Sequence, residues 1–312
     1  MSKEKKKSLK SKIHSRNKNK DKYDLGALLS LNAELGNYLK PNHKGEDSVD
    51  LSNPNAVKLL NQALLNYYYG IKNWNFSDSN ICPTIPNKAD YIHYMADILM
   101  GSNFGNLPEG NHIRCLDIGT GATCIYPIIG AVEYNWNFIA SEINKESIST
   151  AKAIIKSNTI LTNKVDCRLQ PKAKDIIYGV LNRDEKIDIT ICNPPLYNSI
   201  EEVRKEFQKK GSLYKLLDHA NEMICDGGET KFLKQYIKES RAFGDNCFWF
   251  SSLVSKPSNQ KAMADFLKLI GATEIKAIAI GLGHKPKQLL IWSFLTKEAQ
   301  KTWRETKWRA QN

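Results

Sequence analysis

The chain has 312 residues, of which 41% are hydrophobic, and a formal net charge of +12. This length can bury a large core in one long domain or two ordinary ones. No run approaches the roughly 18 to 20 apolar residues that a membrane span needs, so we expect a cytoplasmic protein without a membrane partner. The seven cysteines are scattered without a CxxC pair, which argues against a disulfide framework and a metal site.

The positive charge is concentrated at the N-terminus. Residues 1–22 hold ten Lys or Arg against two acidic residues, and so supply +8 of the net +12. Because this segment has no apolar face, we predict a disordered basic tail, which either binds the phosphates of a nucleic acid or only keeps the protein soluble. The candidate phosphate-binding residues of the tail are Lys5, Lys6, Lys7, Lys10, Lys12, Arg16, Lys18 and Lys20.

The pattern of residues 23–110 predicts a helical accessory module. Asn53 can cap a helix that begins at Pro54, apolar residues follow at helical spacing, and Gly70 can end it. A second amphipathic helix is predicted over residues 88–101, followed by a linker.

From residue 111 to residue 312, short β-rich runs alternate with helical runs, which is typical of βαβ units. Strands are predicted over 113–117, 138–141, 165–169, 187–192, 247–253, 274–280 and 289–295, with helices over 126–134, 145–156, 232–243 and 260–270. The short link between the last two strands predicts a hairpin and hence an antiparallel last strand. The expected fold class is α/β, with a Rossmann-like, seven-stranded, mostly parallel sheet.

The first predicted strand ends in CLDIGTGATC, residues 115–124. After Asp117, Gly119 and Gly121 allow the backbone to turn sharply and approach a ligand at the switch point of a parallel sheet. The dinucleotide pattern GxGxxG is absent because position 124 is Cys. Glu142 follows the second strand, where an acid commonly binds ribose hydroxyls. Together these features favour S-adenosylmethionine over NAD as the cofactor.

The fourth predicted strand stops abruptly in CNPPLY, where Pro194 and Pro195 lack an N–H and fix φ at about −65°. The resulting rigid turn presents Asn193 and the Pro194 carbonyl to the crevice. An amine conjugated to a ring, or an amide nitrogen, is a poor nucleophile because its lone pair is delocalised. Two acceptors for its hydrogens favour the pyramidal form and aim the lone pair at a methyl sulfonium, so the motif predicts amine methylation.

The sequence resembles the bacterial 23S ribosomal RNA adenine N6-methyltransferase family and, more distantly, the eukaryotic methyltransferase-like family that methylates adenine in structured RNAs including U6 small nuclear RNA. The resemblance covers nearly the whole chain and is carried by HSRNKNKDKYD, NPNAVKLLNQALLNYYYGIKNW, CPTIPNKADYIHYMADIL, CLDIGTGATCIYPIIG, SEIN, CNPP, DGGE and IWSF. It implies a class I methyltransferase fold, S-adenosylmethionine as methyl donor, and adenine in 23S rRNA, either free or in a large-subunit assembly intermediate, as the target. We expect a monomer without a metal.

The resemblance also implies roles for single residues. Gly119 and Thr123 would contact the cofactor, and Glu142 its ribose. Asn193 would contact both the cofactor side and the target amine. Lys88 matches a basic residue that faces the cofactor carboxylate, although a solvated loop lysine would have the same pattern.

One position departs from the family. The fourth residue of the motif is usually an aromatic that stacks on the flipped base, but here it is Leu196, followed by Tyr197. Either Leu196 makes an apolar contact, or a shifted loop lets Tyr197 stack. We favour the first, because adjacent residues on an extended turn point apart.

The segment between residues 198 and 229 is expected to hold RNA near the site, because base methylation within a structured RNA requires an extruded adenine and charge on the flanking backbone. Its candidate RNA-binding residues are Arg204, Lys209 and Lys210. A protein glutamine methyltransferase, whose amide substrate poses the same chemical problem, is one alternative. An RNA-binding ribosome-assembly factor without catalytic activity is another.

Overall fold

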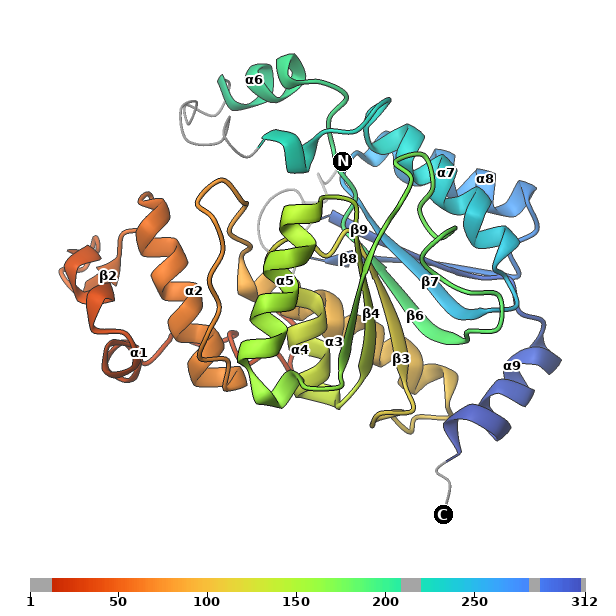
Figure 1. Cartoon of the computed structure of the whole chain (residues 1–312), viewed down its shortest axis with the longest axis horizontal. Helices are drawn as coiled ribbons and strands as arrows, with labels where there is room; N and C mark the ends of the chain where they lie inside the picture. Colours follow the sequence, from red (N-terminus) through yellow and green to blue (C-terminus); the bar gives the residue numbers. More distant parts are fainter. Residues whose placement is uncertain (1–12, 209–219, 281–286, 310–312) are drawn as a thin grey trace, which may run out of the picture.

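The computed structural model describes residues 13–208, 220–280 and 287–309. Its centre is a seven-stranded sheet with the strand order β5-β4-β3-β6-β7-β9-β8 (Figure 1). The strands are β3 (Arg114–Ile118), β4 (Asn137–Glu142), β5 (Val165–Leu169), β6 (Ile187–Cys192), β7 (Cys247–Val254), β8 (Glu274–Ile280) and β9 (Lys287–Ser293). Each of them overlaps one of the predicted strands, so the predicted α/β sheet is confirmed.

Strand β9 runs against both of its neighbours, β7 and β8, while the other pairs in the sheet are parallel. The short connection from β8 to β9 leaves no room for a crossover helix. The predicted antiparallel last strand is therefore confirmed.

Helices cover both faces of the sheet. α3 (Ile85–Ser102), α4 (Ile125–Tyr134) and α5 (Lys145–Ser157) pack on one face, and α7 (Gly228–Ala242) and α8 (Pro257–Leu269) on the other (Figure 1). Successive strand residues point to opposite faces, so Cys115 joins the core beneath α3 and α4 while Leu116 joins the core beneath α7 and α8. The loops after β3, β4 and β6 gather at one edge of the sheet, called here the carboxyl edge. The opposite edge is the amino edge.

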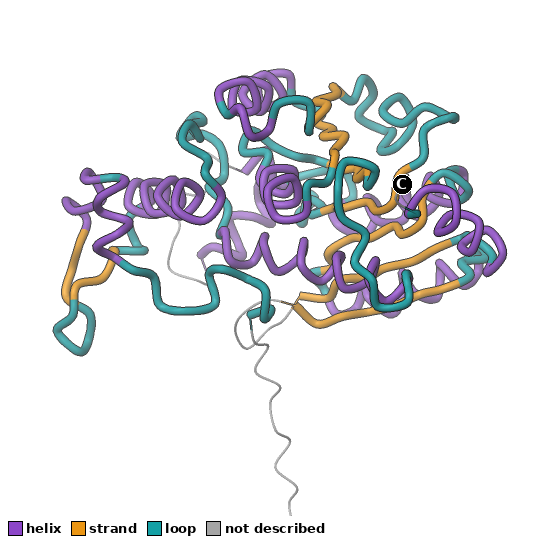
Figure 2. The backbone as a smooth tube through the Cα atoms, turned by 90° about the horizontal axis from the view of Figure 1, so that it is seen from below, coloured by secondary structure: helices purple, strands orange, loops and turns teal. Residues whose placement is uncertain are grey.

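The N-terminal module consists of α1 (Leu25–Leu31), the 3-10 helix η1 (Ala33–Tyr38), the hairpin of β1 (Leu39–Pro41) and β2 (Asp47–Val49), and α2 (Pro54–Tyr69). As predicted, the Asn53 side chain caps α2, Pro54 begins it, and Gly70 ends it in the left-handed conformation with φ of 67°. The hairpin was not predicted; Figure 2 shows it projecting away from the central sheet. Helix α3 shares one hydrophobic core with the sheet, and Leu65 and Tyr69 at the end of α2 belong to the same core.

The prediction of a disordered tail through residue 22 is wrong for residues 13–22. His14, Asn17 and Asn19 are buried against α3, and the Asn17 amide donates to Asp90 Oδ1 at 2.6 Å. His14 Nε2 lies 2.8 Å from Asp97 Oδ2. Polar side chains replace the missing apolar face here, because buried hydrogen bonds hold the segment in place. Composition alone does not reveal such an anchor.

The C-terminal segment packs at the amino edge of the sheet. Helix α9 (Lys297–Trp303) continues into a π-helical turn (Arg304–Trp308), neither of which was predicted. Trp303 and Trp308 are buried in the core on the α3 side. Within the described residues, no helix combines the length and the apolar composition needed to cross a bilayer.

Candidate active site at the carboxyl edge

The strand register brings three predicted site residues to neighbouring positions. Ile118, the last residue of β3, pairs with Ser141 of β4 on one side and Cys192 of β6 on the other. The next residues along the three strands are Gly119, Glu142 and Asn193. Parallel pairing therefore places the glycine turn, Glu142 and the NPP motif side by side.

The glycine turn is held against the end of β4. Gly119 and Thr120 donate their backbone N–H groups to the Ser141 carbonyl at 3.0 and 2.9 Å. Gly119 and Gly121 have φ of 72° and 64°, and a Cβ on either would meet no heavy atom within 4 Å among the described residues. The turn therefore has left-handed backbone that favours glycine and an open side that a ligand can approach.

Glu142 organises the turn as well as facing it. Its Oε2 accepts from Gly121 N at 2.9 Å, and its Oε1 accepts from the backbone N–H groups of Ile143 and Asn144, each at 2.9 Å. Both lone pairs of Oε1 are engaged by these two N–H groups, whereas Oε2 keeps one with which it can accept from a ribose hydroxyl. Thr123 is buried at the end of the turn, and its carbonyl accepts from the Trp74 indole at 2.8 Å.

Asp117 is a buried carboxyl without a partner. It is 0% exposed, and neither carboxylate oxygen has a hydrogen bond within the described part of the chain. Burial raises the pKa of Asp117 to about 7. A buried carboxyl group without a hydrogen bond is costly, so its two oxygens are acceptors that a ligand with hydroxyl or amine groups could satisfy.

Lys88 on α3 supplies positive charge to the same crevice. Its Nζ lies 3.2 Å from the Tyr126 hydroxyl and 4.9 Å from the centre of that ring. Burial, together with the charge of Lys287, lowers the pKa of Lys88 to about 8, while the charge of Asp117 acts in the opposite direction. Lys88 and Asp117 thus lie close enough to influence one another, as expected if both line one site.

The NPP motif is supported from below by α3. The Tyr91 hydroxyl accepts from Cys192 N at 3.1 Å, directly before Asn193, and lies 2.9 Å from Ser251 Oγ. The Asn193 side chain is partly exposed and has no hydrogen bond within the described residues, so its amide is available to a substrate. Sequence reasoning missed Tyr91. Its spacing of three residues from Lys88 on one helix was the available signal.

Leu196 and Tyr197 face different surroundings. Tyr197 lies towards α6 (Ile200–Gln208): burial and then the charges of Glu206 and Glu202 raise its pKa. Leu196 is partly buried. The Tyr197 hydroxyl thus lies near the acidic residues of α6, and which of the two side chains contacts a base stays a prediction.

Four of the predicted RNA-binding cations, Arg16, Lys18, Lys20 and Arg204, lie among the described residues. Arg204 is exposed on α6. Arg16 donates to Asp97 Oδ1 at 2.6 Å, and Lys18 lies 3.0 Å from Glu133 Oε1, so both are engaged within the protein. Lys20 is exposed and donates to the Ser15 carbonyl at 2.8 Å. The other candidates, Lys5, Lys6, Lys7, Lys10, Lys12, Lys209 and Lys210, lie outside the described residues.

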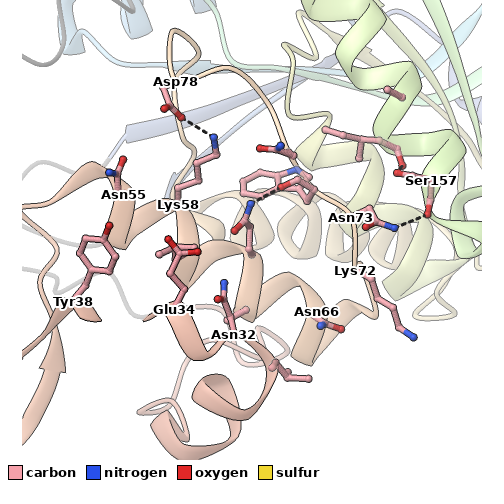
Figure 3. Close-up of a pocket in the computed structure, with 18 residues that line it drawn as sticks. Asn32, Glu34, Tyr38, Asn55, Lys58, Asn66, Lys72, Asn73, Asp78 and Ser157 are labelled. Atoms are coloured by element: carbon pink, nitrogen blue, oxygen red, sulfur yellow. Dashed lines mark hydrogen bonds and ion pairs between the residues drawn. The ribbon is translucent and has the colours of Figure 1, made fainter. Parts of the chain in front are cut away.

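A polar groove of about 760 Å³ lies elsewhere, between the N-terminal module and the end of α5 (Figure 3). Lys58, Lys72, Glu34 and Asp78 line it together with several asparagines. Its charges balance, and it includes no residue of the predicted cofactor site. Among the described residues, no group of three or more His, Cys, Asp or Glu side chains is placed to hold a metal ion.

Comparisons with known proteins agree with this geometry. A family model described as RNA methyltransferase matches residues 7–296. The ribosomal RNA large subunit methyltransferase F of Cytophaga hutchinsonii is 40% identical over 315 residues, covering 96% of each chain. The chain belongs to this RNA methyltransferase family.

Solved structures extend the likeness to three dimensions. The human METTL16 catalytic domain in complex with a MAT2A 3'UTR hairpin matches with a TM-score of 0.77 and 26% identity, covering 92% of this chain and 97% of that chain. The N-terminal domain of human METTL16 in complex with SAH has the same fold, with a TM-score of 0.73, 24% identity, and coverage of 91% and 99%. The predicted class I fold and the predicted S-adenosylmethionine-dependent RNA methyltransferase are confirmed.

Proposed function

We propose that this RNA methyltransferase transfers a methyl group from S-adenosylmethionine to N6 of an adenine in large-subunit ribosomal RNA. The observation that carries the proposal is the juxtaposition of Gly119, Glu142 and Asn193 on adjacent strand ends. The rRNA substrate is supported by the name of the relative that is 40% identical over almost the whole chain. Ribosomal RNA as substrate also favours a cytoplasmic enzyme, and we propose that it acts as a monomer.

The residues at the crevice fit the cofactor. The open side of the glycine turn, the unpartnered Asp117 carboxyl, Glu142 and the Lys88 ammonium together offer acceptors for hydroxyl and amine groups and a cation for a carboxylate. We assign Asp117, Gly119, Gly121 and Thr123 to the cofactor as well as Glu142 and Lys88. When bound, S-adenosylmethionine supplies an electrophilic methyl group on a sulfonium.

Asn193 and the Pro194 carbonyl would then handle the amine. The amine carries two hydrogens, and a carbonyl oxygen accepting each one makes the pyramidal nitrogen more favourable than the planar one. Pro195 keeps the turn rigid because its ring fixes φ. As the nitrogen–carbon bond forms, the carbon–sulfur bond would break and S-adenosylhomocysteine would leave. The nitrogen would become cationic and acidic only then and would release its proton to solvent, so no side chain needs to act as a base before the attack.

The rest of the RNA is proposed to contact cations around this edge. Residues 13–22 are anchored on α3. The basic residues 1–12 are therefore attached to the molecule at this anchor. Arg204, Lys209 and Lys210 follow the NPP motif in the chain. Phosphate contacts of this kind give affinity without sequence preference.

The proposal is tested by incubating the purified full chain with S-adenosylmethionine labelled on the methyl group, together with 23S rRNA, 16S rRNA or a ribosome-free protein fraction. We expect label in 23S rRNA, recovered after nucleoside digestion as N6-methyladenosine. Label on glutamine would establish the protein-methylation alternative. Label at a ring nitrogen would contradict the role given to Asn193, and failure to transfer label to any fraction would support the assembly-factor alternative.

A further inference from the structure

The loop that follows the NPP motif is held along a second segment of the chain. Leu196 N and Tyr197 N both donate to the Met223 carbonyl, at 2.9 and 3.0 Å. In return, Cys225 N donates to the Tyr197 carbonyl at 3.0 Å, which makes a parallel bridge between Tyr197 and Ile224. Residues 196–198 are therefore fixed by backbone contacts to the segment that leads into α7.

Asn198 adds a side-chain contact at the end of this loop. Its Oδ1 accepts from Gly227 N at 2.7 Å, although the residue is exposed to solvent. Gly227 and Gly228 have φ of 73° and 60°. This left-handed pair turns the Gly227 N–H towards the loop, a backbone conformation that other residues rarely adopt.

Gly228 leaves room for the same loop. A Cβ at this position would lie 3.3 Å from Asn198 N, 3.4 Å from the Tyr197 carbonyl carbon and 3.5 Å from Leu196 O. All three atoms are backbone atoms, which cannot swing away as a flexible side chain does. The start of α7 and residues 196–198 are thus in direct backbone contact.

The start of α7 is itself anchored to the rest of the domain. The buried Glu229 carboxylate accepts from Ser255 N at 2.6 Å, in the connection from β7 to α8, and from the Asn259 amide at 2.7 Å, at the start of α8. The sequence DGGE, which carries no role in the chemistry proposed above, therefore links that connection to the loop after the NPP motif.

We propose that Asn198 is a positioning residue for methyl transfer. By holding residues 196–198 against Gly227 and Gly228, it fixes the distance between the NPP turn, which binds the amine, and the methyl group of the cofactor. The inference rests on the proposed function of Asn193. Pro194 and Pro195 have fixed φ, so a shift of the loop behind them is passed to Asn193 rather than absorbed. Misplacement of reacting groups by about 1 Å can cost on the order of 100-fold in rate.

The first test compares Asn198→Ala with Asn198→Asp, which keeps an acceptor oxygen at the same place. With saturating cofactor and 23S rRNA, we expect kcat of Asn198→Ala to fall about tenfold, equivalent to about 1.4 kcal/mol. The cofactor Kd and the melting temperature should not change. Asn198→Asp should retain kcat within about twofold, while its added charge raises KM for RNA. Thr296→Ala, which removes a similar cap bond to Ala299 N at 3.2 Å on α9, is the control.

The second test uses two glycines that both have left-handed backbone, with φ of 60° at Gly228 and 85° at Gly271. Gly228→Ala adds a methyl group against the loop, whereas Gly271→Ala, at φ of 85°, adds one where no heavy atom lies within 4 Å among the described residues. We expect kcat to fall at least tenfold in Gly228→Ala and to be unchanged in Gly271→Ala on the folded fraction. Equal losses of kcat in both variants would mean that strain alone is responsible, and would overturn the proposal.

Further outcomes separate this inference from the proposed function. If the wild type forms N6-methyladenosine and Asn198→Ala matches its kcat, the positioning role is wrong while the proposed function stands. If Asn198→Ala raises only KM for RNA, the side chain binds RNA rather than positioning the loop, which also overturns the inference. If the wild type methylates something other than adenine N6, the proposed function has failed, and kcat for that product in the same variants then decides the positioning role.

Discussion

Two buried aspartates on neighbouring strands have opposite surroundings. Asp117 lies near the carboxyl edge on β3, without a hydrogen-bond partner among the described residues. Asp188 lies near the amino edge on β6 and accepts from Arg114 N at 2.7 Å and from the indoles of Trp303 and Trp308 at 2.8 and 2.7 Å, and it also pairs with Lys307. Both side chains are 0% exposed.

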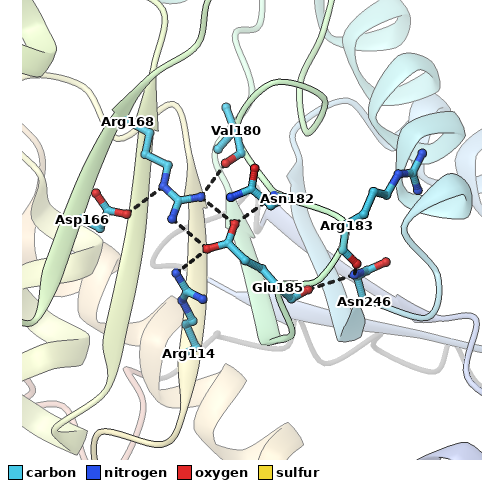
Figure 4. A network of polar contacts seen from close by, with 8 residues as sticks. All are labelled: Arg114, Asp166, Arg168, Val180, Asn182, Arg183, Glu185 and Asn246. Atoms are coloured by element: carbon cyan, nitrogen blue, oxygen red, sulfur yellow. Dashed lines mark hydrogen bonds and ion pairs between the residues drawn. The ribbon is translucent and has the colours of Figure 1, made fainter.

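Other polar residues at the amino and carboxyl edges of the sheet differ in the same way. Below the sheet, Glu185 accepts two bonds from Arg168, at 2.7 and 2.8 Å, and one from Arg114 at 2.6 Å (Figure 4). The pKa of Glu185 is lowered to about 2, and the hydrogen bonds from Arg168 make the largest contribution to this shift. At the carboxyl edge, Asp117 and Asn193 instead keep their acceptors unused. Asp188 and Glu185 are satisfied within the protein, whereas Asp117 and Asn193 keep acceptors that a ligand can use. Unpartnered buried atoms also occur away from the site, at His93 Nε2 and Asn137 Oδ1, so the contrast holds for these four residues.

The largest expected effect comes from removing Asp188, which is satisfied within the protein. Asp188→Ala leaves two indole N–H groups, one backbone N–H and the Lys307 ammonium without their acceptor. We expect the free energy of unfolding to fall by about 3–5 kcal/mol, measured by denaturant titration, with the cofactor Kd of the folded protein unchanged. Asp265→Ala, which breaks the exposed pair with Lys268 at 3.6 Å, is the control and should cost less than about 1 kcal/mol. A Kd that rises with the loss of stability would contradict the separation of the two regions.

Asn193→Ala should produce the converse result. Removing the acceptor for the amine should lower kcat by about 10²- to 10³-fold, as when one preorganised group is lost from an active site. Its free energy of unfolding should stay close to that of the wild type, because Asn193 makes no hydrogen bond within the described residues. Single-turnover methylation and calorimetry measure the two quantities. Turnover equal to that of the wild type would remove Asn193 from the mechanism.

Asp117→Asn sharpens the comparison further, since it should stabilise the protein while weakening the site. The folded pKa of about 7 exceeds the ordinary value of 3.8, so the native state binds more protons between these pH values, and stability falls as pH rises through them. The variant lacks this titration. Its gain in unfolding free energy over the wild type should therefore be about 3 kcal/mol larger at pH 8 than at pH 5. The cofactor Kd should rise about tenfold, as for a lost hydrogen bond to a charged group. A gain independent of pH would show that Asp117 is not a buried ionising group.

Lys88→Gln tests the cation of the crevice. The wild-type ammonium has a pKa lowered to about 8, so it is charged below that value and neutral above it. Calorimetry should give a cofactor Kd about tenfold higher for the variant than for the wild type at pH 6.5, and the ratio of the two should approach one by pH 9.5. The ratio cancels titration of the cofactor itself. Lys72→Gln changes an exposed lysine outside the site. The ratio of its cofactor Kd to that of the wild type should be about one at both pH values.

The contrast also explains which features could be predicted from sequence. The NPP turn, the DIGTG turn and Glu142 are local: each follows directly at the end of a strand whose apolar run is visible, so parallel pairing was enough to bring them together. The cap at Asn53 and the stop at Gly70 are equally local, and the structure has both.

The anchors were not predictable in this way. Asn17 bonds with Asp90 across 73 positions, and Asp188 with Trp308 across 120, so neither pattern is periodic in the sequence. A lysine-rich segment with buried asparagines has the composition of a disordered tail. The hydrogen bonds that order residues 13–22 exist only once α3 is in place.

The smallest expected effect concerns Leu196 at the carboxyl edge, which stands where the family usually has an aromatic residue. Stacking of an aromatic on a base is worth about 1 to 3 kcal/mol, and Leu recovers only part of this by apolar contact. Leu196→Phe should therefore preserve or improve activity on a short RNA fragment. Tyr197, which lies towards Glu202 and Glu206, should tolerate Ala better than Leu196 does. Single-turnover rates on one fragment decide the matter. A severe loss in Tyr197→Ala beside a mild one in Leu196→Ala would mean that the loop shifts on binding and that Tyr197 stacks on the base.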